Sequence, residues 1–142
     1  MSVTIERLRA AVRESGTPIA SALTDDAVDP RGDEHALTAS GGPRVADHRE
    51  AVEIAVAAVD EGYRLHYARP RALRIDDPDL ALLAGDRMYA LGLAQLAAVG
   101  DLTAIAELAD IIALSAQAHA DGDIGLADAA WRAGVAAIAG TA

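Results

Sequence analysis

The sequence predicts an all-α fold, in which a single domain forms an up-down helical bundle of five to six helices. Apolar residues recur at helical spacing along most of the chain, and no useful stretch alternates as a strand would. They make up 52% of the 142 residues, which is enough for one core. Aromatic residues are only 3% and Phe is absent, so this core must consist of Ala, Leu, Ile and Val. Such small side chains favour close helix packing.

The N-terminal third is expected to contain two short helical elements. A first helix of about a dozen residues places Ile5, Leu8 and Val12 on one face and ends near Gly16. Thr17 followed by Pro18 then starts a short second element, because proline suits the first helical turn. This element is expected to stop near residue 23.

Residues 24–44 are expected to form a mobile acidic loop, since aspartate, glycine and proline are frequent there. The next helix is predicted to start at Asp47, which with Glu50 resembles a capping box. A bend or pause is expected at Gly62. Two prolines, at positions 70 and 78, bracket a predicted linker.

The last third of the chain predicts three helices in series, at about 78–99, 101–120 and from 123 onward. Each junction is a Gly-Asp pair, at 100–101 and 122–123. Glycine permits the left-handed residue that ends one helix, and aspartate accepts from the free N–H groups of the next. Connections this short predict antiparallel neighbours.

The charge of the chain excludes several classes of function. A net charge of −10, with 12 arginines and no lysine, argues against binding to nucleic acid and to anionic membrane surfaces.

Charged residues interrupt every apolar stretch, so no membrane span is expected. The chain has no cysteine for a disulfide, a thiolate metal site or a nucleophile. The first residues lack the apolar run of a signal peptide, and a cytoplasmic location is therefore expected.

Gly85-Asp86 is unusual because this Gly-Asp pair falls inside a predicted helix, where glycine costs about 1 kcal/mol relative to alanine. One interpretation is a close helix crossing, with Gly85 and Gly92 both facing a neighbouring backbone. The other is that Asp86 points into a cleft and shares one helical stripe with Asp79. Carboxylate oxygens in that arrangement suit Mg²⁺. The magnesium ligands considered are Asp76, Asp77, Asp79 and Asp86.

The chain has two clusters of acidic residues, at 76–79 and at 25–29, and each also has an interpretation that involves no metal. Residues 76–79 fit a helix N-terminus, where acids complement the helix dipole and Asp77 serves as the cap. Residues 25–29 (DDAVD) have the spacing of a magnesium-binding aspartate motif. In a chain with 22 acidic residues, such spacing also arises by chance.

A third of the basic residues lie between residues 63 and 74. Guanidinium groups offer a planar set of donors that suits phosphate or carboxylate, and neighbouring rings could add stacking or polar contacts. The predicted ligand-binding residues are Arg69, Arg71, Arg74, Tyr67 and His66. The alternative is that these arginines pair internally with residues 76–79 and with the acidic loop.

The segment from about residue 79 to residue 120 resembles trans-prenyl diphosphate synthases. The resemblance rests on Leu-Ala-Gly-Asp at 83–86, Met-Tyr-Ala-Leu at 88–91 and the helix end at Gly100-Asp101. It implies an isoprenoid-synthase-like all-α fold in which this helix lines a central cavity. It also implies that any catalysis would be Mg²⁺-dependent prenyl-diphosphate transfer.

The sequence departs from that family in three respects. The motif at 25–29 lies over fifty residues before Leu-Ala-Gly-Asp, whereas the family's first aspartate-rich motif lies shortly before it. No second such motif occurs near the C-terminus, and the chain is roughly half the family's usual length. We therefore expect a small non-catalytic helical protein that acts as an oligomeric binding or partner subunit. It would self-associate or pair with a larger helical partner, and could bind an apolar ligand. The alternative is a Mg²⁺-dependent enzyme or binder of a prenyl diphosphate.

Overall fold

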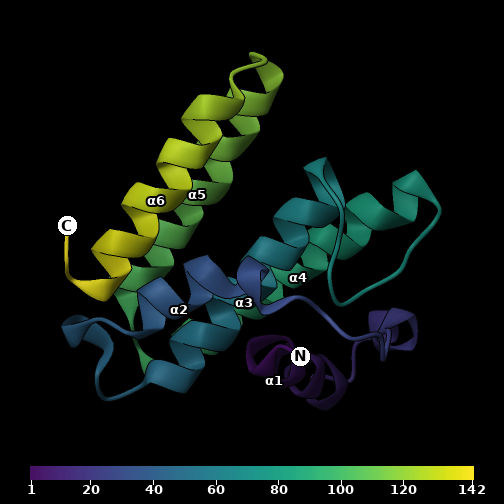
Figure 1. Ribbon diagram of the computed structural model, residues 1–142, viewed down its shortest axis with the longest axis horizontal. Coiled ribbons are helices and arrows are strands. Elements are labelled where there is room, and N and C mark those ends of the chain that lie inside the picture. Colours follow the sequence, from purple (N-terminus) through teal and green to yellow (C-terminus); the bar gives the residue numbers. More distant parts are fainter.

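The computed structural model describes all of residues 1–142 (Figure 1). The fold consists of six α-helices and three short 3₁₀ turns. The α-helices are α1 (Val3–Glu14), α2 (Glu34–Ser40), α3 (Arg49–Tyr67), α4 (Pro78–Val99), α5 (Leu102–Ala120) and α6 (Ile124–Ala139). The 3₁₀ turns are η1 (Pro18–Ala22), η2 (Pro30–Asp33) and η3 (Pro43–Val45). No strand is present, and the predicted all-α bundle is confirmed.

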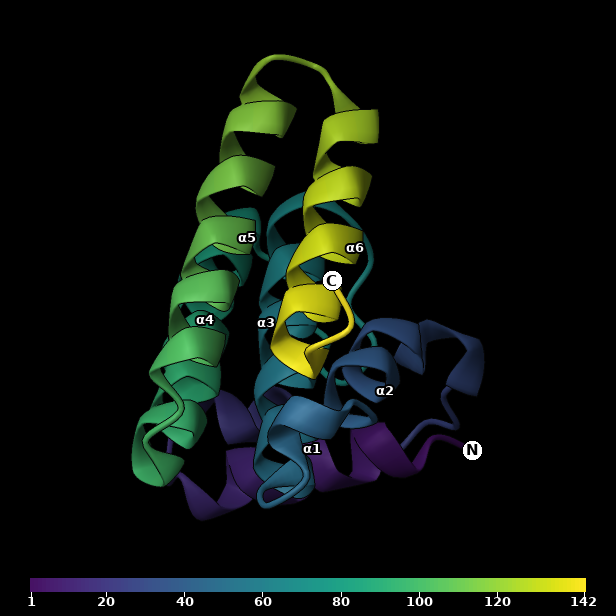
Figure 2. The same ribbon diagram turned by 90° about the vertical axis from the view of Figure 1, so that its left-hand side faces the viewer.

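The four long helices lie alongside one another, and α1 crosses beneath them (Figure 2). α3 packs mainly on α4, and α5 packs mainly on α6, so the bundle consists of two paired units. The short α2 contacts both α3 and α6 and thereby connects the units. No helix combines the length and the apolar character needed to cross a membrane.

The core is aliphatic, as the composition predicts. α3 lies at its centre, and its Val52, Val56 and Val59 are fully buried. Met88 of α4 and Leu108 of α5 pack into the same cluster. Every long helix therefore contributes apolar surface to one core, which is the main source of stability in a bundle of this kind.

The helix junctions in the last third are confirmed. Gly100 and Gly122 adopt positive φ angles of 72° and 70°, which let the preceding helices end. Asp77, Asp101 and Asp123 then cap α4, α5 and α6 by accepting hydrogen bonds from backbone N–H groups of the first turn. These interactions are local in sequence, and the sequence therefore predicts them well.

Two predictions for the first half are wrong. Residues 24–44 are not one loop, because η2, α2 and η3 occupy much of that range. Asp33, at the end of η2, is buried and accepts hydrogen bonds from Ser2 and Arg71, which tie this acidic segment to the rest of the fold. The predicted cap at Asp47 is also absent. α3 begins after His48, whose side chain forms no capping hydrogen bond, and it continues through Gly62 to Tyr67.

Candidate functional site

A buried glutamate holds the arginine-rich linker between α3 and α4. Glu61 is 1% exposed, and its carboxylate accepts hydrogen bonds from the backbone N–H groups of Arg71, Ala72 and Leu73 at 2.9–3.0 Å. Burial raises the pKa of Glu61, and the three amide donors oppose that rise. The linker is therefore fixed to the end of α3.

The segment after η1 holds the linker from its other side. The Thr24 N–H donates to the Ala72 carbonyl, and the Arg74 N–H donates to the Ala22 carbonyl, each at 2.9 Å. This short antiparallel pairing brings the predicted acidic segment next to the predicted basic one. The two segments are far apart in sequence, so only the fold places them together.

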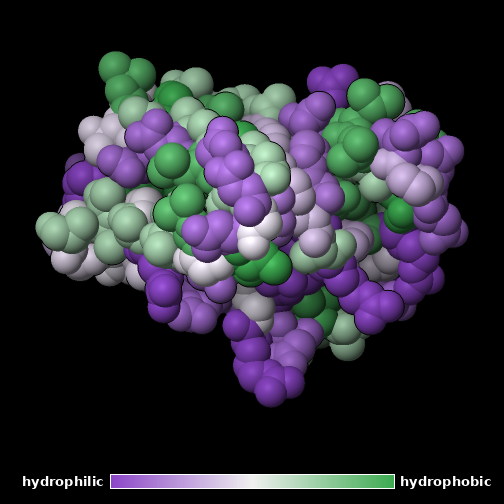
Figure 3. Space-filling view, turned by 90° about the horizontal axis from the view of Figure 1, so that it is seen from above, coloured by the Kyte–Doolittle hydropathy of each residue, from purple (hydrophilic) through white to green (hydrophobic).

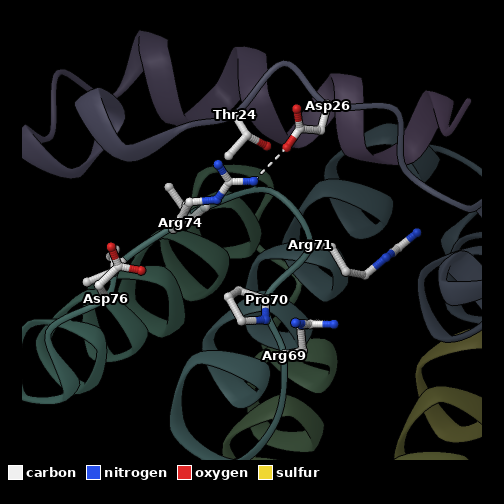
Figure 4. A pocket seen from close by; sticks show the side chains of 9 residues that line it. Thr24, Asp26, Arg69, Pro70, Arg71, Arg74 and Asp76 are labelled. Carbon is white, nitrogen blue, oxygen red and sulfur yellow. Dashed lines mark hydrogen bonds and ion pairs between the residues drawn. The ribbon is translucent and has the colours of Figure 1, made fainter.

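A cleft of about 380 Å³ opens between these two segments (Figure 4). Its lining residues are Thr24, Asp26, Arg69, Pro70, Arg71, Leu73, Arg74, Ile75 and Asp76. The Arg74 guanidinium donates to Asp26 at 2.9 Å, and the Arg71 guanidinium donates to Asp33 at 2.8 Å. Arg69 forms no hydrogen bond or ion pair. The internal pairing considered for these arginines is therefore confirmed for two of the three.

The acidic motif at 25–29 is also used for internal ion pairs. Its aspartates pair with three different arginines, namely Asp25 with Arg13, Asp26 with Arg74 and Asp29 with Arg31. Hydrogen bonds from Arg31 lower the pKa of Asp29 to about 2. Because the carboxylates face separate arginines, they do not converge as a magnesium motif would.

The structure does not bring together the four carboxylates predicted as magnesium ligands, which are Asp76, Asp77, Asp79 and Asp86. No group of three or more His, Asp or Glu side chains is placed to hold a metal ion. Asp77 is instead the cap of α4, where it accepts from the N–H groups of Asp79 at 2.9 Å and Leu80 at 3.3 Å. The structure does not assemble these carboxylates into one metal position, and the helix N-terminus accounts for Asp77.

Gly85 faces α3, and Asp86 lies at the rim of the same helix crossing. Gly85 is buried, whereas the side chain of Asp86 is 69% exposed and its carboxylate lies 3.2 Å from His66 Nε2. Gly92 lies against the carbonyl oxygen of Ala55 in the same helix crossing. The close-crossing interpretation is therefore confirmed, and the inward orientation considered for Asp86 is wrong.

Two other predicted ligand-binding residues, His66 and Tyr67, do not line the cleft. Tyr67 instead stacks on His119 of α5, with ring centroids 4.0 Å apart and planes within 5°. The Tyr63 hydroxyl forms a 2.7 Å hydrogen bond with His119 Nε2. Tyr63 also packs edge-on against Trp131 of α6. These rings fill the space between α3 and the α5–α6 unit and have a packing role.

A second polar centre, which sequence reasoning missed, surrounds Asp101 at the α4–α5 junction. Its side chain is 2% exposed and accepts from both terminal nitrogens of Arg44, at 2.9 and 2.7 Å. His48 Nε2 lies 2.7 Å from the same carboxylate. Burial alone would raise the pKa of Asp101. Hydrogen bonds from Arg44, the Ala104 amide and His48 outweigh burial and hold the pKa well below its usual value.

Comparisons with known proteins give no further assignment. Protein-family models, curated proteins and solved structures all give no significant match to this chain. The functional interpretation therefore depends on the geometry of the chain itself. That geometry provides a nearly charge-balanced cleft with one free guanidinium, at Arg69, but no shared metal position.

Proposed function

We propose that this chain is a small non-catalytic helical subunit that acts by assembling with a second copy of itself through the outer face of α5. The observation that carries this proposal is an uncharged apolar stripe on the solvent side of that helix. Its exposed residues are Leu102, Ala106, Ala109, Ala113, Ala116 and Ala120. We call this set the α5 stripe.

The α5 stripe is unusual for a helix at the surface of a monomer. The opposite side of α5, including Leu108 and Ile111, is buried in the core, and Ile105 and Ile112 are half-buried. Within its 19 residues, α5 has only two acidic residues and no arginine. Thr103, Asp110 and Gln117 are exposed outside the stripe, and a helix face that is apolar along its whole length is normally covered. In Figure 3, hydrophobic and weakly hydrophobic residues lie among hydrophilic ones over the left half of the view.

Charge favours a second copy at this position. Each chain has a net charge of −10, so two copies repel one another over most of their surfaces. The α5 stripe itself contains no charge, although the exposed Asp110 lies beside it, and repulsion is therefore weaker where two stripes meet than over a charged surface. Alanines also let two helix axes approach closely. A two-fold interface, in which the same patch is used twice, satisfies both conditions.

The dimensions of the face also fit a dimer. α5 is about 28 Å long and about 10 Å wide. Two stripes of this length could lie along one another over the whole of α5, as a two-fold interface requires.

Two features support the non-catalytic part of the proposal. The four carboxylates expected to hold Mg²⁺ lie apart, and two of the three cleft arginines are already neutralised by aspartates. The resemblance of residues 79–120 to trans-prenyl diphosphate synthases supports a helical build of that type, with the catalytic motifs missing. A subunit of this kind would act through association.

Size-exclusion chromatography with light scattering tests the proposal. The expected mass is twice the 14.6 kDa of one chain. Ala109→Glu places a charge at the centre of the α5 stripe and is expected to give the monomer mass. Ala133→Glu, at an exposed alanine of α6, is the matched control and is expected to remain dimeric. A wild-type protein that is monomeric at 100 µM, or two variants that behave alike, would contradict the proposal.

A further inference from the structure

A second pocket lies beside the arginine cleft, between η1 and the first half of α4. Its volume is about 540 Å³, within the ~300–1,000 Å³ typical of small-molecule sites. Its apolar lining consists of Ile19, Ala22, Ile75, Leu80, Leu83 and Ala84. Leu80 and Leu83 are 55% and 65% exposed, so part of this lining is uncovered apolar surface.

The charge of this pocket differs from that of the whole chain. Its lining includes Arg74 and Arg87 but no acidic residue, although acids outnumber arginines by 22 to 12 in the protein. Arg74 is already paired with Asp26. Arg87 forms no hydrogen bond or ion pair with any protein group. The pocket therefore offers one unneutralised guanidinium beside an apolar surface.

Thr17 provides a second, independent indication of a ligand. Thr17 is among the residues that line this pocket, and it also lines the adjoining depression, which Arg87 shares. Thr17 is 8% exposed, and its Oγ1 has no hydrogen-bond partner. A buried hydroxyl without a partner is unfavourable, and Thr17 places one at the end of the pocket that Arg87 also lines.

We propose that this pocket binds a single-chain aliphatic carboxylate. The carboxylate would pair with the Arg87 guanidinium near Thr17, because that group is planar and matches two carboxylate oxygens. The aliphatic chain would lie along Leu80 and Leu83 and reduce their exposure to water. This site is separate from the α5 stripe and does not depend on self-association.

The charges at the pocket indicate a monoanion. Only Arg87 is free, and no cluster of acids or histidines stands nearby to recruit a metal that could neutralise a polyanion. A ligand with several negative charges would face the overall charge of −10 with one guanidinium to offset it. A carboxylate needs only that one partner.

Calorimetric titration of the full chain with octanoate, decanoate and dodecanoate, below their micelle concentrations, tests this proposal. We expect saturable binding of one ligand per chain, with affinity rising by up to about fourfold per CH₂ that the pocket covers. Decanol is expected to bind at least tenfold more weakly than decanoate. Inorganic phosphate at the same concentration is expected not to compete.

Arg87→Gln separates a specific site from general adsorption. It should weaken decanoate binding at least tenfold, while Arg132→Gln, at another exposed arginine without an ion pair, should leave it unchanged. Leu83→Gln should weaken decanoate binding and flatten the chain-length dependence. Circular dichroism confirms that each variant is folded. Absence of decanoate binding at millimolar concentration, equal effects of the two arginine variants, or tighter binding of decyl phosphate than of decanoate would overturn the proposal.

Discussion

Gly62 of α3 lies directly against Gly85 of α4, where the two helices cross. A methyl group added at Gly62 would stand 2.7 Å from the carbonyl oxygen of Gly85 and equally close to the ring of Tyr89. A methyl group at Gly85 would stand 3.0 Å from the carbonyl oxygen of Gly62 and closer still to His66. Because neither Gly62 nor Gly85 has a side chain, α3 and α4 can pack closely at this crossing.

Gly62→Ala is expected to destabilise the protein by about 1–3 kcal/mol, because the backbone oxygen of Gly85 cannot move without separating the helices. This loss should exceed the ~1 kcal/mol that alanine gains in helix propensity. Urea denaturation measures the change. Gly125→Ala in α6, where a methyl group meets nothing closer than 3.6 Å, is the control and should leave stability equal or slightly higher. Equal behaviour of the two variants would show that the crossing is not tight.

The helix junctions and the α3–α4 crossing show which features the sequence can predict. The Gly-Asp junctions at 100–101 and 122–123 depend on backbone conformation and capping within a few residues, and they appear where predicted. A glycine in the middle of a helix predicts that another group packs closely against the helix, but it does not show whether that group is a neighbouring helix or a ligand. The crossing at Gly85 is therefore only one of two interpretations that the sequence allows. The orientation of Asp86 depends on how α4 rotates against α3, and a helical stripe alone does not fix that rotation.

Features that depend on distant residues could not be predicted. The composition of segment 24–44 predicts a loop, but Asp33 in it pairs with Arg71, 38 residues away. The arginines near Tyr67 in sequence predict a ligand site, whereas the Tyr67 ring stacks on His119 of another helix. Two of the three cleft arginines have acidic partners as predicted, and those partners lie in the 24–44 segment rather than at 76–79.

Glu61→Gln should loosen the linker between α3 and α4. The amide side chain retains one acceptor oxygen and turns its NH₂ group toward backbone donors, so at least one of the three N–H groups at Arg71, Ala72 and Leu73 loses its partner. The expected loss is about 1–3 kcal/mol of unfolding free energy. Hydrogen exchange at these amides should accelerate more than in the rest of the chain. Glu14→Gln, at an exposed glutamate without an ion pair, should change stability by less than ~0.5 kcal/mol. Unchanged exchange in the linker would contradict the assigned role.

Asp101 should make folding stability depend on pH in the acid range. Its pKa is lowered in the folded state, so its ionisation stabilises the fold above the unfolded pKa of about 3.9 and that contribution is lost as the pH falls. Asp101→Asn should cost about 2–3 kcal/mol at pH 7, because Arg44 and His48 lose a charged acceptor. The difference between wild type and variant should shrink by about 1 kcal/mol at pH 3.

Urea unfolding of both proteins at pH 7, 4 and 3 measures that difference. The comparison isolates Asp101, since the other carboxylates are common to both chains. Asp128→Asn, at an exposed aspartate of α6 without an ion pair, is the control and should differ little from wild type at each pH. A difference between wild type and Asp101→Asn that stays constant from pH 7 to pH 3 would contradict the lowered pKa.

Salt should strengthen the proposed dimer. Two chains of −10 each repel over long distances, and the α5 stripe at the interface contains no charge whose attraction salt could weaken. Raising NaCl from ~20 mM to ~200 mM shortens the screening length from about 20 Å to about 7 Å and removes much of this repulsion. The dissociation constant measured by sedimentation equilibrium is therefore expected to fall severalfold. Ala109→Glu adds one negative charge to each stripe and should require more salt to associate than Ala133→Glu. An interface held by ion pairs would weaken in salt, and that result would rule out the uncharged α5 stripe as the contact surface.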